Sequence, residues 1–361
     1  SVVPRDPAAK RADRMRSAGR NGEVSMTVDV QTTRDVVDII TGGWRAQALY
    51  TAVKLGLPDH VEAGLGTDAE LAKATGASEG GVHRLMRLLV AMGIFEGDGS
   101  TGYRGTRMSA ALLEGPGSLG DMCLLYGEEF YSAWGHAHHA IGTESSGFEV
   151  AYGRPFYDHL GQDAAVARRF QATMNTAGMF FHRVPEVFDF SGKRVVDVGG
   201  GGGQLLATIL EAVPDARGTL FDREHMMPKA REHLVAAVGP DRVELVPGDM
   251  FRSVPEGGDV YVLCRVLAGH DDEAVVRVFE HCRRAMADSS SRLLILDRFV
   301  TDENPTVLPS LWDLHLLVTT GGEHRTVDRI TRLLGRAGME IAGTAELPME
   351  TTALIVAPRP A

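Results

Sequence analysis

One stretch constrains the fold more than any other: residues 193–206, where a β-branched run meets five consecutive glycines and an apolar helix pattern. Residues 195–198 predict a buried parallel strand, and Leu and Ile at helical spacing after Gly203 predict a helix. A strand, a glycine turn and a helix open a nucleotide-binding α/β sheet. The glycines allow a ligand to approach closely, and the helix N-terminus offers free N–H groups to a negative group.

The spacing of these glycines excludes two common phosphate sites. The dinucleotide fingerprint needs a third Gly or Ala five residues after the first, but Gln204 stands at that distance from Gly199, and Leu205 from Gly200. No Lys-Ser or Lys-Thr pair follows the glycines, which excludes a P-loop. What remains is a glycine turn followed by Asp222, which ends the next apolar run. A carboxylate at that position suits the two hydroxyls of a ribose.

Strand and helix patterns alternate regularly from residue 194 to the end of the chain. Strands are predicted at 194–198, 218–221, 243–246, 259–263, 293–296 and 352–357, and helices at 203–213, 228–238, 272–287 and 327–337. This alternation predicts an α/β domain with a doubly wound sheet over residues 191–361. Ligands of such sheets bind beyond the carboxyl ends of the strands, where Gly199, Asp222, Asp249 and Cys264 all fall.

The first 190 residues divide into three predicted parts. Residues 1–30 are rich in Arg and lack an apolar stripe, which predicts a flexible basic arm. Residues 31–115 predict helices, a helix–turn–helix that contains the capping-box pair Thr67 and Glu70, and a short hairpin near residues 94–104, which together are typical of a winged helix. Residues 116–190 predict a helical linker whose aromatic and methionine side chains form core and line a substrate pocket.

Composition limits the partners and the compartment. The net charge of −11 disfavours nucleic acid, and the recognition helix of the winged-helix pattern offers few basic side chains. No stretch of about 20 apolar residues predicts a membrane span. Three scattered cysteines, Cys123, Cys264 and Cys282, favour a reducing cytoplasm. We therefore expect a cytoplasmic protein that acts on a small molecule, without nucleic acid or membrane partners.

The order of these elements from about residue 35 resembles the S-adenosylmethionine (SAM)-dependent O-methyltransferases of natural-product biosynthesis. The motifs that carry the resemblance lie at 197–203, 222, 248–251, 263–273 and 313–326. The resemblance implies a class I methyltransferase sheet, a winged-helix dimerisation domain, a homodimer formed largely through residues 1–115, and SAM as cofactor. It implies that the methionine part of SAM faces Gly199 and Gly201, the ribose Asp222, and the adenine Asp249 and Met250, with Met174 beside the cofactor and Cys264 near its carboxylate.

The sequence departs from this family where the chemistry occurs. The family carries Leu-His-Asp-Trp after the strand at 259–263, and this His is the base that removes the phenol proton. Here Ala268 occupies the position of the base and His270 the position of the Trp. Base-assisted O-methylation is therefore not expected, and three hypotheses remain.

The favoured hypothesis is metal-assisted C-methylation. Gly269-His270-Asp271 resembles SAM-dependent C-methyltransferases of 2-oxo acids, in which a metal ion chelates the substrate. The resemblance implies His270, Asp271 and His315 as catalytic residues and metal ligands, with Zn, Fe, Co and Ni equally suitable. The structural alternative makes Asp271 or Asp272 the N-cap of the following helix.

The second hypothesis is an O-methyltransferase of an aromatic natural product that works without a base, by proximity and on an acidic substrate. The third is a SAM-binding relative with different, non-methylating chemistry. Asp297 stands where the family orients its base, and 323–325 resembles a helix-entry loop. His136, His138 and His139 are predicted to be solvated.

Overall fold

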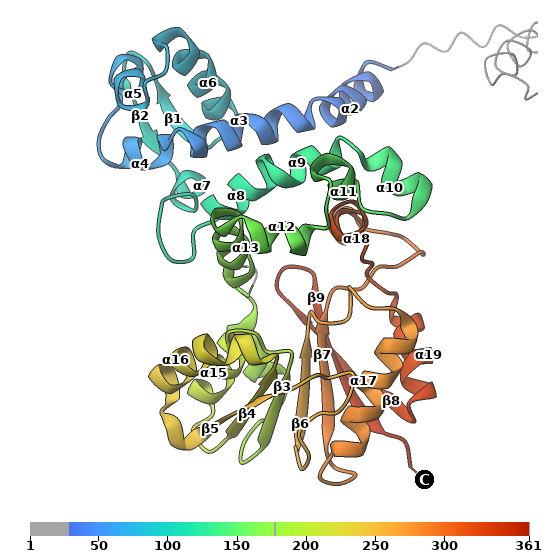
Figure 1. The fold of residues 1–361 in the computed structure, drawn as a ribbon. Helices are drawn as coiled ribbons and strands as arrows, with labels where there is room; N and C mark the ends of the chain where they lie inside the picture. Colours follow the sequence, from blue (N-terminus) through green and yellow to red (C-terminus); the bar gives the residue numbers. More distant parts are fainter. Residues whose placement is uncertain (1–28, 177, 361) are drawn as a thin grey trace, which may run out of the picture. The chain divides into compact units, whose positions relative to one another are not determined.

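The computed structural model describes residues 29–176 and 178–360 (Figure 1). The predicted basic arm, residues 1–30, lies outside the described residues except for its last two. The chain forms two compact units, one ending at Gln47 and one beginning at Ala48. The first contains α2 (Val30–Ile40) and the start of α3 (Gly42–Lys54). Helix α2 buries none of its residues, and its apolar residues Ile39 and Ile40 are exposed.

The second unit opens with the predicted winged-helix pattern. Its elements are α4 (Leu57–Glu62), α5 (Asp68–Thr75), α6 (Glu79–Ala91), β1 (Phe95–Asp98), β2 (Gly102–Gly105) and α7 (Arg107–Ala110). The predicted capping box is present, since Thr67 accepts from the Glu70 N–H while the Glu70 carboxylate accepts from the Thr67 N–H. Gly97 has a φ of 89°, and a Cβ there would come within 2.1 Å of the Gly102 carbonyl oxygen, so the hairpin requires glycine.

A run of short helices follows. It comprises α8 (Gly120–Gly127), α9 (Glu129–Trp134), α10 (Ala137–Thr143), α11 (Gly147–Tyr152), α12 (Phe156–Gln162), α13 (Ala164–Thr176) and α14 (Val184–Val187). Phe130, Phe148 and Phe156 are buried together in its core, as predicted for most aromatic residues of this stretch. The core also includes Val318 of α18 (Val307–Thr320), a helix from the C-terminal part of the chain.

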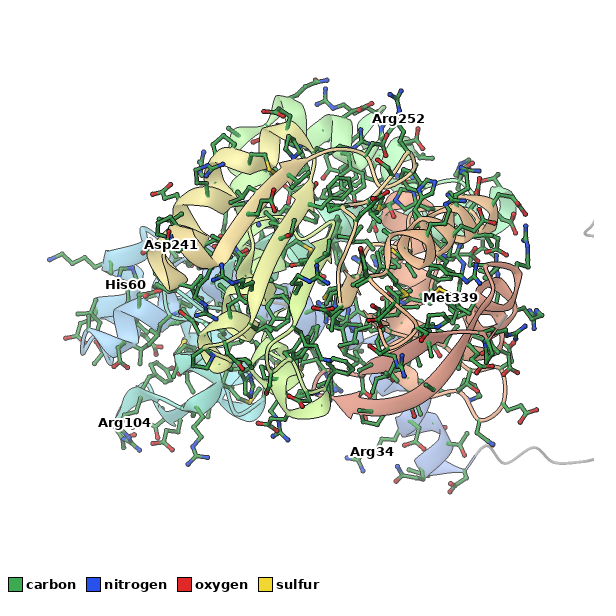
Figure 2. All side chains as sticks on the ribbon, turned by 90° about the horizontal axis from the view of Figure 1, so that it is seen from below. Arg34, His60, Arg104, Asp241, Arg252 and Met339 are labelled. Atoms are coloured by element: carbon green, nitrogen blue, oxygen red, sulfur yellow. The ribbon has the colours of Figure 1, made fainter. Side chains whose placement is uncertain are left out.

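A seven-stranded sheet forms the C-terminal domain, in the order β5-β4-β3-β6-β7-β9-β8. The strands are β3 (Arg194–Val198), β4 (Arg217–Asp222), β5 (Val243–Pro247), β6 (Val260–Cys264), β7 (Arg292–Asp297), β8 (Met339–Leu347) and β9 (Thr351–Pro358). Strands β3 to β7 pair in parallel, whereas β9 is antiparallel to both β7 and β8. Strands β5 and β8 form the two edges of the sheet, and Figure 2 labels a residue near each edge, Asp241 just before β5 and Met339 at the start of β8.

Alternate residues of the central strands enter two separate cores. Val195, Val260 and Val262 pack with α15 (Gln204–Ala212) and α16 (Met227–Val238). Val196 and Tyr261 pack instead with α17 (Asp272–Ala285) and α19 (Val327–Arg336). Because successive strand residues point to opposite faces, helices cover both faces of the sheet, which confirms the predicted doubly wound α/β class.

Two elements were absent from the prediction. Strand β8 carries Ala, Gly and Thr at several positions, so its alternating burial is not matched by an alternating apolar pattern. Helix α18 is apolar on most sides, with no clear amphipathic stripe to mark it as a surface helix. Among the described residues, no helix combines the length and the apolar character needed to cross a membrane.

Candidate cofactor and acceptor sites

The glycine turn after β3 is shaped to receive a ligand. Gly199 and Gly201 have φ values of 73° and 58°, a left-handed conformation that disfavours other residues. A Cβ on Gly199 would lie 2.8 Å from Val266. The N–H of Gly201 donates to the carboxylate of Asp222 at 2.8 Å, so the ends of β3 and β4 are joined directly. The predicted pairing of the glycine turn with Asp222 is thus present in the structure.

Asp197, in β3, was not singled out as a site residue. It is 2% exposed, and neither of its carboxylate oxygens has a hydrogen-bond partner among the described residues. Burial, together with the charge of Asp222, raises the pKa of Asp197 to about 7. A buried carboxylate without a partner is costly, and a cation bound at the turn would compensate it. SAM carries an ammonium and a sulfonium, so these residues fit the predicted cofactor.

A cavity of about 160 Å³ lies at the ends of β3 and β4. Its lining comprises Gly199, Phe221, Asp222, Arg223, Gly248, Met250, Phe251 and His270. The rings of His270 and Phe251 meet edge to face with centroids 4.7 Å apart. Asp249 accepts from the Phe251 N–H at 2.9 Å and faces Arg223 at 3.7 Å. His270 therefore belongs to the wall of this cavity, together with Met250.

This position of His270 corrects the metal hypothesis. The described residues contain no group of three His, Cys, Asp or Glu side chains able to hold a metal ion. Asp271 caps α17 by accepting from the Ala274 N–H at 2.8 Å, the role of the structural alternative. His315 lies elsewhere, on α18. The three predicted ligands do not form a metal site. His270 lines the cavity, Asp271 caps α17, and His315 packs in the core of the helical segment.

The surroundings of His315 are aromatic. Its ring packs against Tyr126, Phe130 and Trp312, with centroid distances between 4.8 and 5.8 Å. Trp134 donates its indole N–H to His315 Nδ1 at 3.2 Å. Burial lowers the pKa of His315 to about 4, so the imidazole is neutral at physiological pH. The residue acts as a polar member of the helical core.

For two further residues, Cys264 and Met174, the predicted role in binding the cofactor remains a proposal. Cys264 ends β6, and burial raises the pKa of its thiol, which stays protonated. Met174 lies in the last turn of α13 with a side chain that is 42% exposed. Its neighbour Asn175 accepts from Gln204, the first residue of α15, at 3.3 Å, so this end of α13 is near the glycine turn.

The loop that contains Ala268 is fixed by one buried arginine. Arg325 is 4% exposed and donates to the carbonyl oxygens of Leu267 and His270 as well as to Asp272 at 2.8 Å. The sequence favoured a helix-entry loop for this stretch, and the structure adds that Arg325 sets the backbone of residues 267–272. Ala268 is held in this backbone with a side chain that cannot accept a proton.

Asp297, Glu323 and His324 line the same small pocket as Ala268, and the Glu323 N–H donates to the Ala268 carbonyl at 3.0 Å. Asp297 is 5% exposed, accepts from the Arg298 N–H at 2.9 Å, and has its pKa raised to about 6 by burial. Burial, with help from Arg298 and Arg265, lowers the pKa of His324 to about 4. At neutral pH the histidine is therefore uncharged and the carboxyl is mainly ionised.

Two arginines follow the carboxyl ends of neighbouring strands and were not predicted as site residues. Arg265 comes directly after β6 and Arg298 directly after β7. Arg265 has a φ of 55°, which a bulky side chain adopts at a cost of about 1–3 kcal/mol and which is concentrated at functional sites. The rule that ligands bind beyond the strand ends was the available signal for both residues.

Family models match most of the chain. Residues 37–115 match the O-methyltransferase dimerisation domain, and residues 134–340 match the O-methyltransferase domain. The chain belongs to the O-methyltransferase family and is a SAM-dependent methyltransferase.

Relatives with stated activities resemble the chain over nearly its whole length. The phenazine-1-carboxylate N-methyltransferase of Pseudomonas aeruginosa is 40% identical over 329 residues, 91% of this chain and 98% of that protein. The 3-amino-4-hydroxybenzoate 4-O-methyltransferase of Streptomyces cremeus is 38% identical over 88% of each protein. The structure of the pyocyanin biosynthetic protein PhzM matches with a TM-score of 0.84 at 40% identity, over 91% of this chain and all of that one.

These comparisons support a natural-product methyltransferase and not C-methylation of 2-oxo acids. The resemblance of Gly269-His270-Asp271 to the metal-dependent C-methyltransferases is therefore not supported, and the metal-assisted hypothesis is withdrawn. The second hypothesis, O-methylation of an aromatic natural product without a base, agrees better with the relatives.

Proposed function

We propose that this enzyme transfers a methyl group from SAM to a heteroatom of a planar aromatic natural product, without a protein base. A ring nitrogen of a phenazine-like acid is the favoured acceptor. The observation that carries the proposal is Ala268, which stands where the family has its proton acceptor. An aromatic ring nitrogen offers its lone pair directly and has no proton to lose, so an alanine suffices at that position.

The cofactor is held by the ends of β3, β4 and β5 in this proposal. When bound, SAM would supply a methyl group on a positively charged sulfur; the acceptor would bond to this methyl carbon in one step, and S-adenosylhomocysteine would leave with the electron pair of the broken carbon–sulfur bond. Gly199 and Gly201 leave room for its methionine part, Asp222 accepts from the ribose hydroxyls, and Asp249 and Met250 adjoin the adenine. Asp197 supplies the buried negative charge that favours a cationic ligand.

The chain contributes to catalysis by positioning and by excluding water. Arg325 holds the loop of residues 267–270 in one conformation, so that the acceptor meets a fixed wall. The neutral His324 and the aromatic side chains of α8 and α18 surround the acceptor with low-dielectric groups. Holding nucleophile and methyl donor in line is worth several orders of magnitude in rate without acid–base help.

A second candidate, O-methylation of an acidic phenol, is favoured by the relative from Streptomyces cremeus, whose name states a 4-O-methyl product. The acidity of the acceptor separates the two functions. A phenol must lose its proton to water, so its methylation rate should rise about tenfold per pH unit below its pKa. A ring nitrogen whose lone pair is already free shows no such rise.

The test is a pH–rate profile between pH 7 and pH 9, with phenazine-1-carboxylate and with 3-amino-4-hydroxybenzoate, each at saturating SAM. We expect phenazine-1-carboxylate to be methylated on nitrogen, as shown by mass spectrometry and NMR of the product, at a rate independent of pH in this range. Turnover of the phenol alone, with a rising profile, would replace the favoured acceptor by the second. No methyl transfer to either heteroatom would overturn the proposal.

We also propose that the enzyme works as a homodimer. Exposed apolar residues recur along α2 and the start of α3, namely Val36, Val37, Ile39, Ile40 and Trp44. A stripe of this kind marks an interface more often than free surface. A monomeric mass in light scattering at micromolar concentration would count against the dimer.

A further inference from the structure

The two arginines beyond β6 and β7 lie close together beside the aromatic side chains of α8 and α18, and the proposed reaction assigns no role to either of them. Cys264 and Leu296 are paired in the sheet, and the next N–H, that of Arg265, donates to the Leu296 carbonyl at 3.0 Å. Asp297 and Arg298 follow immediately. The left-handed backbone at Arg265 turns the chain at this point. Arg265 and Arg298 therefore both follow directly on the carboxyl ends of neighbouring strands in the sheet.

Aromatic rings accompany both guanidinium groups. The guanidinium carbon of Arg265 lies 4.8 Å from the centroid of Phe180, and that of Arg298 lies 4.6 Å from the centroid of Trp312. Tyr126 meets Trp312 edge to face at 5.9 Å. The positive charges of both arginines also oppose the burial that raises the pKa of Tyr126, so the three groups share one electrostatic environment. Flat apolar surface and positive charge thus occur together.

The turn between β8 and β9 accepts hydrogen bonds from both arginines and holds them in place. Arg298 donates through Nε to the Met349 carbonyl at 3.3 Å, and Arg265 donates through Nη2 to the Thr351 hydroxyl at 3.3 Å. Met349 and Glu350 adopt φ values of 60° and 56°, so this turn is itself strained. Both strained segments thus adjoin the same pair of cations, an arrangement of the kind found at many ligand-binding sites.

The charge of Arg298 and two buried polar atoms nearby lack a direct partner among the described residues. Arg298 forms no ion pair with any carboxylate in residues 29–176 and 178–360, and the acids near it are Glu350 and the buried Asp297. Burial, and then repulsion from Arg265, lower the pKa of Arg298 to about 10. Trp312 Nε1 and His324 Nδ1 are buried without a hydrogen-bond partner among the same described residues. A bound anion would offset the positive charge and accept from the indole N–H.

We infer that Arg265 and Arg298 form a subsite for a carboxylate on the aromatic acceptor, with Trp312 and Tyr126 against its ring. The inference rests on the proposed function, because it concerns the same acceptor, and it narrows the substrate class to planar aromatic carboxylic acids. Arg298 binds the carboxylate and Arg265 supports it. The acceptor is thereby oriented before methyl transfer, which makes the arginines specificity residues.

The first experiment compares an acid with its neutral analogue on the unmodified enzyme. Calorimetry on protein saturated with S-adenosylhomocysteine, which cannot donate a methyl group, measures the affinities of phenazine-1-carboxylate and phenazine-1-carboxamide. We expect the acid to bind about tenfold or more tightly, as for a charge-assisted hydrogen bond. Equal affinity of acid and amide would overturn the inference without the need for any variant.

The second experiment removes the charge. In Arg298→Met, the ratio of the affinity for phenazine-1-carboxylate to that for phenazine-1-carboxamide should fall to less than about threefold. Arg298→Lys should retain part of this preference for the acid. The control is Arg359→Met, which removes an exposed cation beyond β9 that lies 3.8 Å from Glu340. Melting temperature and affinity for S-adenosylhomocysteine report whether each variant is folded. A folded Arg298→Met that keeps the full preference would assign the carboxylate to another group.

The outcomes separate this inference from the proposed function. Preference for the acid without methyl transfer to nitrogen would retain the subsite and reject the favoured reaction. Methyl transfer to nitrogen with no preference for the acid would retain the reaction and reject the subsite.

Discussion

The two halves of the proposed site, one for the cofactor and one for the acceptor, follow different rules. The cofactor half comes from three successive strand ends, β3, β4 and β5, and its parts, Gly199, Asp222 and Asp249, lie within about fifty residues of each other. The acceptor half is assembled from the ends of β6 and β7, the turn between β8 and β9, and helices α8 and α18, which lie far apart in the chain. The first half keeps the family pattern, whereas the second has lost the family base at Ala268.

The difference shows where this fold tolerates change. The glycine turn is constrained by backbone geometry, since Gly199 and Gly201 have positive φ values and a Cβ on Gly199 or Gly200 would lie within 2.8 Å of a neighbouring side chain. The acceptor half is constrained only by the shape and charge of the substrate. Its chemistry can therefore change by single substitutions, while the sheet beneath it stays the same.

The largest effect is expected where the two halves are joined, at Arg325. Replacement by Met should lower the free energy of unfolding by about 3 kcal/mol or more, because a buried partner of Asp272 is lost and two carbonyl groups lose their donor. Urea unfolding measures the change. The matched control is Arg336→Met, which breaks the exposed ion pair with Glu273 at the same helix and should cost less than about 1 kcal/mol. Similar losses in both variants would contradict the assigned role of Arg325.

The next effect tests the acceptor half through pH. His315 is neutral in the folded state, with a pKa of about 4, and takes up a proton on unfolding at its ordinary pKa of 6.5. The unfolded state therefore binds more protons between pH 6.5 and pH 4, and stability falls as the pH decreases through this window. At pH 5 the contribution is about 2 kcal/mol relative to pH 7.5. His315→Phe should flatten the curve of unfolding free energy against pH.

The variant also removes the acceptor of the Trp134 indole, which lowers stability equally at every pH and leaves the slope to report the titration. His138→Phe, on the exposed surface of α10, is the control. An unchanged slope in His315→Phe would mean that the histidine is protonated in the folded protein.

The sequence was sufficient for most of the fold and for bringing the glycine turn and Asp222 together; that these residues bind the cofactor stays a prediction. Strand β3, the glycine turn and Asp222 are local features, and each carries its own signal in residue type and spacing. Strand β8 was missed because small residues that also suit loops, Gly343 and Ala345, occupy two of its half-buried positions. Arg265 and Arg298 were missed because a guanidinium group is functional only through what surrounds it. Their aromatic and backbone partners come from residues 126, 180, 312, 349 and 351, and only the tertiary structure joins these positions.

His270 was misassigned for a related reason. The same residue types, Gly269-His270-Asp271, suit either a metal site or a loop that lines a cavity and caps a helix. The direction of the His270 side chain decides between these two roles. The His270 ring lies against Phe251, in the cavity at the ends of β3 and β4, and Asp271 caps α17.

The third prediction concerns Asp222 in the cofactor half. Replacement by Ala removes the acceptor of the Gly201 N–H and, in the proposed site, that of the ribose hydroxyls. SAM binding should weaken by about tenfold or more, which corresponds to about 1.4 kcal/mol. Calorimetry with SAM measures the change, with Asp241→Ala before β5 as an exposed control (Figure 2). Unchanged affinity in Asp222→Ala would remove the cofactor assignment.

The smallest effect gives the sharpest contrast between the two interpretations of His270. As part of the cavity wall, its imidazole contributes packing against Phe251 and the bound cofactor, which is worth about 1 kcal/mol or less. His270→Ala should therefore weaken SAM binding by about threefold to fivefold and raise the KM for SAM, while turnover at saturating SAM stays within twofold. A metal ligand would give the opposite result, since SAM affinity would be retained and turnover lost. Initial rates at several SAM concentrations, with calorimetry of the same protein, distinguish the two results. His138→Ala controls for the loss of an imidazole remote from the cavity.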